Sequence, residues 1–178
     1  MTIDSTPFEG CFIFTPDVFR DSRGYFFESF NERQFEEISG IKVSFVQDNQ
    51  SFSKYGTIRG LHFQKGEFEQ AKLVRVIKGE IFDVAVDLRP ESPSYLKWFG
   101  LVLSEDNNKQ LFIPKGFAHG FSVLSQEAIV LYKCDNFYNK EAEAGILYDD
   151  PTFNIDWQIA LKDRVLSDRD LKLPFFKI

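Results

Sequence analysis

Short runs of apolar and aromatic residues, separated by turn-forming residues, recur along most of this chain. Val, Ile, Phe and Tyr favour β-strands, whereas Gly, Asn, Asp and Ser favour the turns between them. Many short strands with turn signals between them are typical of β-sandwiches and barrels. The pattern therefore predicts an all-β protein, with strands at residues 8–14, 25–30, 43–52, 58–64, 71–77, 80–88, 98–103, 110–113, 120–125 and 128–137.

One short helix is predicted between the second and third strands. Asn31 is a good N-cap residue, Gln34 follows at capping-box spacing, and Gly40 is a typical C-terminal stop. From Asp149 on, the alternating pattern ends and short helical or irregular segments are expected, with Ser167 as an N-cap. We therefore expect an all-β fold with a small helical tail, in a single domain of residues 1–178.

The clearest local pairing signal is a hairpin formed by residues 71–77 and 80–88, with the turn at Gly79. In the second arm apolar residues alternate with a second set that includes Asp83 and Asp87. Such a half-polar alternation is typical of a barrel wall with a wet interior or surface.

Composition narrows the class of partner. Hydrophobic residues make up 43% and charged residues 27% of the chain, which is ordinary, but 21 phenylalanines are unusual and suit a barrel or sandwich filled from inside. The net charge is −6 and there is no run of Lys or Arg, which argues against a nucleic-acid partner. A small anionic ligand needs only a few local cations and stays compatible with this charge.

The expected location is the cytoplasm. No apolar stretch is long enough for a transmembrane helix, so no membrane partner is expected, and the N-terminus lacks the basic and apolar regions of a signal peptide. Cys11 and Cys134 lie far apart in the sequence, and two cysteines make neither a disulfide framework nor a zinc knuckle. We expect two free thiols.

Four residues carry the candidate chemistry. The chain has only two histidines, His62 and His119, each near a glycine at a strand end, and histidine changes charge near neutral pH. Lys72 would share a strand face with valines, where it is either a solvated strand end or a cation aimed into a pocket that stabilises an oxyanion. Tyr132 is either a packing residue or a general acid. His62 could equally be a core residue with a backbone partner.

Arg59 and His62 have opposite parity in a regular strand and would point to opposite faces. Gly60 between them offers a bulge that brings both side chains inward.

A metal site is not expected. Residues 114–119 resemble the Pro-x-Gly-x-x-His element of cupin barrels, whose metalloenzymes usually take further ligands from an earlier strand pair. Here that earlier region offers His62 and Gln64, without a His-x-His pair, so the ligand set falls short.

The chain as a whole resembles the dTDP-4-dehydrorhamnose 3,5-epimerase family, nucleotide-sugar epimerases of the cupin superfamily. The similarity runs from Phe8 to Pro174 and implies a cupin-type jelly-roll barrel. It rests on segments that occur in the family's order and at similar spacing: residues 21–29, 45–51, 58–64, 70–76 and 113–121.

The resemblance implies that the substrate is dTDP-4-dehydro-6-deoxy-D-glucose, epimerised at C3 and C5 to the precursor of dTDP-L-rhamnose. The C4 ketone acidifies the protons on both neighbouring carbons, so a base can remove a proton to give an enolate and an acid can return one to the opposite face. The reaction needs no redox or metal cofactor.

Matched position by position, the resemblance implies His62 as general base, Asp170 as its carboxylate partner, Tyr132 as proton donor and Lys72 as the cation beside the enolate oxygen. Asp170 would favour the imidazolium form and orient the ring. Arg169 stands where the family often has lysine. The positions implied in substrate binding, with arginines suited to the diphosphate, are Arg23, Glu28, Gln47, Asn49, Arg59, Lys72, His119, Tyr138, Glu143 and Arg169.

The family is dimeric, with an N-terminal strand that reaches into the neighbouring subunit, so the resemblance implies a homodimer with strand exchange. The phenylalanines that could form this interface, or equally the core, are Phe12, Phe14, Phe26, Phe27 and Phe30. Three alternatives to the double epimerase remain open: an epimerase that acts at C3 only, a metal-dependent cupin enzyme, and a sugar-nucleotide binding module without turnover.

Overall fold

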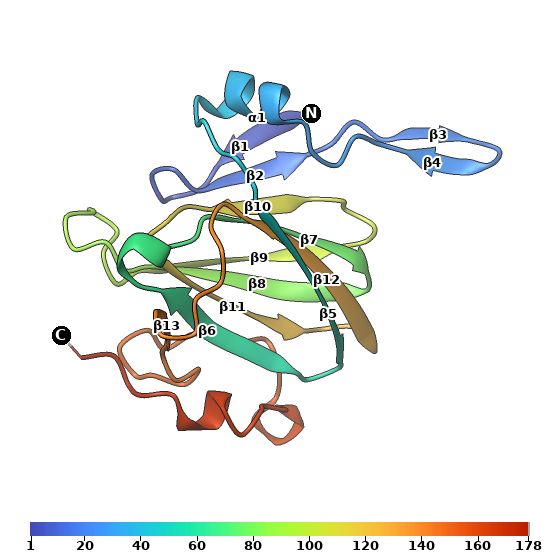
Figure 1. The fold of residues 1–178 in the computed structure, drawn as a ribbon. Helices are drawn as coiled ribbons and strands as arrows, with labels where there is room; N and C mark the ends of the chain where they lie inside the picture. Colours follow the sequence, from blue (N-terminus) through green and yellow to red (C-terminus); the bar gives the residue numbers. More distant parts are fainter. Residues whose placement is uncertain (178) are drawn as a thin grey trace.

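The computed structural model describes residues 1–177, and two antiparallel sheets packed face to face form its body (Figure 1). The six-stranded sheet runs in the order β1 (Thr2–Ser5), β2 (Phe12–Thr15), β10 (Gln110–Ile113), β7 (Lys72–Lys78), β12 (Glu127–Cys134) and β5 (Gln47–Lys54). The five-stranded sheet runs in the order β13 (Glu143–Gly145), β6 (Ile58–Gln64), β11 (Phe117–Val123), β8 (Glu80–Asp87) and β9 (Trp98–Ser104). The predicted all-β jelly-roll architecture is confirmed.

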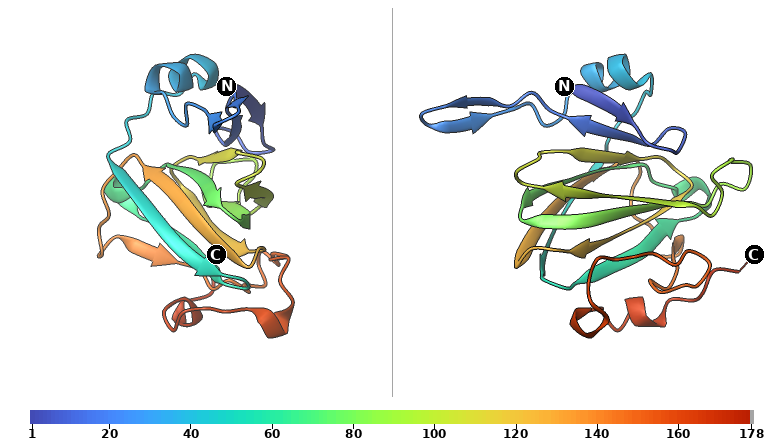
Figure 2. Two further views of the ribbon diagram at one scale, coloured as in Figure 1. Left: turned by 90° about the vertical axis from the view of Figure 1, so that its right-hand side faces the viewer. Right: turned by 180° about the vertical axis from the view of Figure 1, so that it is seen from behind.

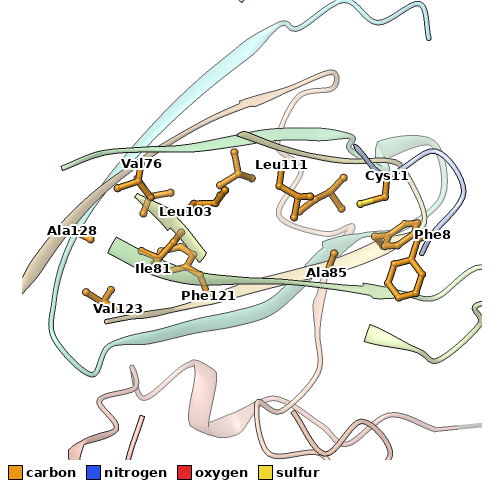
Figure 3. Close-up of a cluster of buried hydrophobic side chains, with 14 residues drawn as sticks. Phe8, Cys11, Val76, Ile81, Ala85, Leu103, Leu111, Phe121, Val123 and Ala128 are labelled. Atoms are coloured by element: carbon orange, nitrogen blue, oxygen red, sulfur yellow. The ribbon is translucent and has the colours of Figure 1, made fainter. Parts of the chain in front are cut away.

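The main core lies between the two sheets (Figure 3). It is built from the inward side chains of both sheets, among them Val74 and Val76 of β7 and Ile81 and Ala85 of β8, all buried. Phe8 and Cys11 close it at one end. The interior is therefore mostly apolar, and a charged side chain that enters it is unusual.

The predicted helix is confirmed as α1 (Glu32–Ser39). The Asn31 side chain accepts a hydrogen bond from the backbone N–H of Gln34, and Gly40 ends the helix in the left-handed conformation with φ of 70°. Phe35 on its buried face stacks against Phe14 of β2 at a centroid distance of 4.8 Å. These contacts cover the outer end of the six-stranded sheet with a second apolar cluster.

The predicted hairpin is wrong. β7 pairs with β10 and β12, whereas β8 pairs with β9 and β11, so Gly79 carries the chain from one sheet to the other. Gly79 has φ of 77°, and a Cβ there would lie 2.0 Å from the carbonyl oxygen of Glu127. The turn was recognisable locally, but strand partners are set by contacts distant in sequence.

The half-polar alternation of β8 does not mark a solvent-exposed side, because the strand is buried along nearly its whole length. The C-terminal segment covers its outer face with a third apolar cluster that includes Phe153 and Trp157. Figure 2 shows this segment running beneath the five-stranded sheet. The segment contains the predicted short helical turns, which are η2 (Leu161–Asp163) and η3 (Asp170–Lys172); a further turn, η1 (Gly66–Phe68), follows β6.

Several predicted strand limits are wrong. The strand placed at residues 8–14 begins only at Phe12, because Phe8 belongs to a tight turn in the core, and the strand placed at 43–52 begins at Gln47. The strand placed at 128–137 ends at Cys134. The pattern missed the short strands β1 and β13, which depend on pairing with β2 and β6.

A hairpin of β3 (Phe19–Asp21) and β4 (Gly24–Phe26) projects away from the body (Figures 1 and 2). Within residues 1–177 its two strands pair only with each other, around a turn at Ser22 and Arg23. Phe19 and Phe26 are 64% and 69% exposed. Each strand of the hairpin therefore carries a largely exposed aromatic side chain. No helix within residues 1–177 is long and apolar enough to cross a membrane.

Candidate active site

A cavity of about 360 Å³ opens between the two sheets at one end of the barrel. Strands β5, β7 and β12 of the larger sheet and β6 and β11 of the smaller sheet supply its walls. Most residues predicted for the site meet here: Gln47, Asn49, Arg59, His62, Lys72, His119, Tyr132, Tyr138 and Glu143 line the cavity.

The candidate base lies on β6 and is bonded to the C-terminal segment. Nε2 of His62 lies 2.6 Å from Oδ1 of Asp170, and the Ser167 hydroxyl donates to Oδ2 of the same carboxylate at 2.8 Å. Burial alone would raise the pKa of Asp170, but the hydrogen bonds from His62 and Ser167 lower it overall. The carboxylate is therefore held ionised beside the ring and fixes its orientation. The predicted cap at Ser167 also forms, since it accepts from the backbone N–H of Asp170.

Arg59 and His62 both line the cavity, as the predicted bulge requires. The register of β6 against β11 shifts between His119 and Phe121, and Gly60 has φ of 123°. A Cβ at Gly60 would lie 2.6 Å from Cα of Gly120, so only glycine allows the two strands to approach this closely.

The guanidinium of Arg59 is held by the neighbouring strand. Its Nε donates to the Ser53 hydroxyl at 2.9 Å and its Nη2 donates to the carbonyl of Phe52 at 3.3 Å. Within residues 1–177 the other N–H groups of Arg59 have no partner and can bind an anionic oxygen, and the fixed planar fork suits a phosphate.

The β5 wall presents amides in a fixed orientation. The backbone N–H of Tyr138 donates to Oε1 of Gln47 at 3.0 Å, and Nε2 of Gln47 donates to Oδ1 of Asn49 at 3.0 Å. Nδ2 of Asn49 in turn contacts Sγ of Cys134 at 3.6 Å. Because a backbone N–H only donates, both side-chain amides direct their NH₂ groups along this wall. Each NH₂ group has a second N–H beyond the bond described, from which a ligand oxygen can accept a hydrogen bond.

Lys72 and Tyr132 lie side by side on β7 and β12. Nζ of Lys72 is 6.0 Å from the centroid of the Tyr132 ring, and within residues 1–177 the ammonium has no hydrogen-bond or ion-pair partner. Burial lowers the pKa of Lys72 and raises that of Tyr132. A cation without a partner in a cavity wall is placed to meet a negative charge on a ligand. The cavity-facing interpretation of Lys72 is thus supported over a solvated strand end.

The second histidine also has a carboxylate partner. His119 of β11 pairs with His62 of β6 in the strand register, and its Nε2 lies 2.7 Å from Oδ1 of Asp83 on β8. The Asp83 side chain is completely buried. The cavity wall therefore contains two imidazole rings, each bonded to a different carboxylate.

A hydrogen-bonded group lies at the rim. The Tyr138 hydroxyl donates to Oε2 of Glu143 at 2.7 Å, and Glu143 forms an ion pair with Arg169. Burial would raise the pKa of Glu143, but the bonds from Arg169 and Tyr138 lower it overall. Arg169 itself is largely exposed and reaches the cavity through this carboxylate.

Two predicted residues are not brought to the cavity of their own chain. Arg23 is at the tip of the β3–β4 hairpin, where it is exposed and bonded to Asp21. Glu28 follows the hairpin and is exposed.

The sequence interpretation also missed residues of the site. Ser51 continues the inward row of Gln47 and Asn49 on β5, so strand alternation could have found it. Asp83 could not be found this way, because its alternation is equally typical of a solvent-facing side chain. Asp83 does not line the cavity itself but lies behind His119; besides Ser51, the missed lining residues are Phe63, Gln64, Gln70 and Phe121.

The arrangement provides a base held by a carboxylate, a phenol, an unpartnered ammonium and a wall of donors for an oxygen-rich anion. This combination suits proton removal next to a carbonyl, followed by proton return. Within residues 1–177 no group of three or more His, Cys, Asp or Glu side chains is placed to hold a metal ion.

Comparison with known proteins agrees with this chemistry. Residues 5–177 match the family model of dTDP-4-dehydrorhamnose 3,5-epimerase. The dTDP-4-dehydrorhamnose 3,5-epimerase of Shigella flexneri is 52% identical over 171 residues, covering 96% of this chain and 93% of that protein.

Solved structures of two such enzymes superimpose on nearly the whole chain. The dTDP-4-dehydrorhamnose 3,5-epimerase of Elizabethkingia anophelis has a TM-score of 0.95 at 50% identity, covering 99% of this chain and 96% of that one. The dTDP-6-deoxy-D-glucose-3,5-epimerase of Legionella pneumophila, solved in complex with dTDP-4-keto-L-rhamnose, has a TM-score of 0.92 at 43% identity, covering 99% of both chains.

Proposed function

The chain belongs to the dTDP-4-dehydrorhamnose 3,5-epimerase family, and we propose that it converts dTDP-4-dehydro-6-deoxy-D-glucose to dTDP-4-dehydro-L-rhamnose with the residues of the cavity described above. The observation that carries the proposal is the His62–Asp170 bond of 2.6 Å, in the same cavity as Tyr132 and Lys72. The enzyme is an isomerase that supplies dTDP-L-rhamnose biosynthesis.

His62 removes the proton from the carbon next to the C4 ketone, and the C–H electron pair moves to form the enolate. The Lys72 ammonium stabilises the negative charge that develops on the C4 oxygen. Tyr132 then gives its phenolic proton to the opposite face of the same carbon, which inverts it. Before the second carbon reacts, His62 releases the proton that it took and Tyr132 regains one by exchange with solvent. The same steps then invert the second carbon and complete the double epimerisation.

Asp170 stabilises the imidazolium that forms when His62 takes the proton. The bond uses Nε2 of His62, so Nδ1 is the nitrogen left to face the substrate. The proton transfer therefore takes place at Nδ1 of His62.

The donor wall and the rim bind the nucleotide part of the substrate. Arg59, Gln47 and Asn49 donate to diphosphate oxygens, which their fixed orientations support. Tyr138 at the rim stacks on the base or sugar, with Glu143 and Arg169 holding its hydroxyl. His119 binds the sugar beside His62.

The protein works as a homodimer in which the β3–β4 hairpin of one protomer reaches the cavity of its partner. The exposure of Phe19 and Phe26 on the projecting hairpin supports this arrangement. It also gives Arg23 and Glu28 a role in substrate binding that they lack within their own chain. The single domain predicted for residues 1–178 stays part of this proposal, with residue 178 outside the described residues. A cytoplasmic location is supported by two buried free cysteines, Cys11 and Cys134.

Product analysis tests the proposal. The protein is incubated with dTDP-4-dehydro-6-deoxy-D-glucose and a 4-ketoreductase that traps the product, and the sugar is identified by NMR. An L-rhamnose product is expected. Inversion at C3 alone would instead show a C3-specific epimerase, and binding without conversion would show a sugar-nucleotide binding module. Activity lost on chelation and restored by a divalent metal would support the metal-dependent alternative.

A further inference from the structure

The most unusual charged group outside the proposed mechanism is Asp83. Its side chain is 0% exposed, Oδ1 contacts Nε2 of His119 at 2.7 Å, and Oδ2 has no hydrogen-bond partner in the described structure. A carboxylate buried with an unpaired oxygen costs folding free energy. Asp83 does not itself line the cavity, but its partner His119 does, so such a cost directly behind a cavity residue indicates a role in that cavity.

Asp83 faces the interior in the same row of β8 as Ile81 and Ala85, and Lys72 faces it in the same row of β7 as Val74. The two charges therefore project into one apolar interior from opposite sheets. Neither forms an ion pair with the other or with a third Lys, Arg, Asp or Glu residue in the part of the chain described. In such surroundings charges act on each other over longer distances than in water.

The bond to Asp83 also determines which nitrogen of His119 is available. An ionised carboxylate only accepts hydrogen bonds, so Nε2 of His119 carries the proton that it donates to Oδ1. Nδ1 has no partner within residues 1–177, and the ring lines the cavity. His119 thus presents Nδ1 to a ligand, in the same way as His62, which uses Nε2 for Asp170.

We propose that Asp83 is a positioning residue of the epimerisation: it holds His119 with Nδ1 toward the substrate and sets a fixed negative charge opposite Lys72. The inference rests on the proposed function, because Lys72 must be an ammonium ion to stabilise an enolate. Burial lowers the pKa of Lys72, and negative charge on Cys134, Asp83 and Glu143 opposes this effect. Burial raises the pKa of the Cys134 thiol, and of the two carboxylates only Asp83 is fully buried.

The first test is Asp83→Asn, which keeps the shape and removes the charge. The measured quantity is the rate of solvent deuterium uptake at C3 as a function of pH. Both proteins also carry Tyr132→Phe, so that ionisation of the tyrosine does not contribute to the alkaline limb, the part of the profile where the rate declines with rising pH. We expect uptake to fall roughly tenfold near neutral pH and its alkaline limb to move to lower pH, because Lys72 loses its proton more readily. His62, His119 and Glu143 line the same cavity as Lys72, Cys134 is its strand partner on β12, and all four are the same in both proteins.

Asp87→Asn is the matched control. Asp87 is an equally buried carboxylate on the same face of β8, but it is bonded to Arg89, Ser92 and Ser94 in the following loop. This variant should lose stability without moving the alkaline limb. The proposal would be overturned if Asp83→Asn changed neither the rate of deuterium uptake near neutral pH nor the pH of the alkaline limb.

If Asp83→Asn fails to fold, a measurement on the unaltered protein tests whether Asp83 holds His119 in the proposed orientation. With only two histidines, ¹⁵N NMR of the imidazole rings resolves His119 from His62, and a His62→Ala sample assigns them. The proposal expects a proton fixed on Nε2 of His119, whereas a proton fixed on Nδ1 alone would overturn it. This result does not depend on turnover, so it is separate from a failure of the proposed function.

Discussion

Asp170 lies 108 residues after His62 in the sequence, yet its carboxylate contacts the imidazole at 2.6 Å. The backbone of the C-terminal segment is bonded on both sides of this contact. Ile58 donates to the carbonyl of Val165 at 2.9 Å before it, and Leu147 donates to the carbonyl of Pro174 at 2.9 Å after it. His62 is thus oriented by the C-terminal segment, which lies outside the barrel and is anchored to the barrel at two points.

Replacing Asp170 with Asn should reduce kcat roughly 100-fold, because the imidazolium that forms on proton abstraction loses its counter-charge. KM should change less, since Asp170 lies behind the ring. Steady-state kinetics with the coupled reductase check both. A variant with normal kcat would remove Asp170 from the mechanism.

The same substitution should change the pH dependence of stability. The folded protein holds the pKa of Asp170 below its ordinary value of 3.8, so its contribution to stability is full above that value and is lost as the pH falls through the folded pKa. The difference in unfolding free energy between the native protein and Asp170→Asn should therefore narrow below about pH 4. Denaturant unfolding at several pH values measures it, and a constant difference would contradict this linkage.

Replacing Lys72 with Met should stabilise the protein and inactivate it. An ammonium without a partner is costly to bury, whereas Met fills the same space without charge. Loss of the cation at the enolate oxygen should reduce kcat roughly 10²- to 10³-fold. Thermal unfolding and steady-state kinetics of Lys72→Met together test this prediction. Lys133→Met is the control: it removes a lysine that is paired to Asp48 and should keep its activity. A lower melting temperature for Lys72→Met would contradict the argument.

The wild-type protein should also gain stability with rising pH because of Lys72. Its folded pKa lies below the ordinary value of 10.5, so between these two values the unfolded chain binds more protons than the folded one. Stability contributed by this group rises with pH across that window. Lys72→Met lacks the rise, which denaturant unfolding at alkaline pH can measure.

The local features of the fold were predictable because short-range interactions determine them. Asn31 and Gly40 set the ends of α1, and the strand at residues 58–64 coincides with β6. Strand pairing was not predictable, as the turn at Gly79 shows, because the same tight turn can return a strand to its neighbour or pass it to another sheet. β8 appeared half-exposed because its sequence does not reveal that its polar side, with Asp83 and Asp87, faces the space between the two sheets while the C-terminal segment covers its apolar side.

The site could be predicted mainly because its motifs resemble those of a known family. Spacing within β6 correctly suggested that Gly60 turns both Arg59 and His62 inward. Neither spacing nor composition could place Asp170, which reaches His62 only through tertiary packing. Asp83 was missed for the opposite reason, since an acidic residue in an alternating strand is usually solvated.

Replacing Tyr132 with Phe should separate the two halves of the reaction. Deuterium uptake at a ring carbon should persist, because His62 and Lys72 remain, while inversion should fall roughly 100-fold without the phenolic proton. NMR in deuterium oxide, with the reductase present, reports both. Loss of uptake as well as inversion would place Tyr132 in the first step or in the structure of the site.

The proposed dimer predicts complementation between two inactive variants. If Arg23 of one protomer serves its partner's cavity, a mixed dimer of Arg23→Ala and His62→Ala contains one site with both defects and one intact site. Co-refolding equal amounts should restore about a quarter of the wild-type activity through random association into two-fold dimers. No recovery, with mixed dimers demonstrated by mass spectrometry, would contradict the exchange of hairpins.

The identity of the base is the central claim, and deuterium uptake by His62→Ala tests it most directly. The variant is mixed with dTDP-4-dehydro-6-deoxy-D-glucose in deuterium oxide, and dTDP binding is measured in parallel to show that the cavity is intact. We predict retained dTDP binding and no uptake at C3 or C5 above the uncatalysed rate. Uptake near the wild-type rate would show that another group abstracts the proton and would contradict the account.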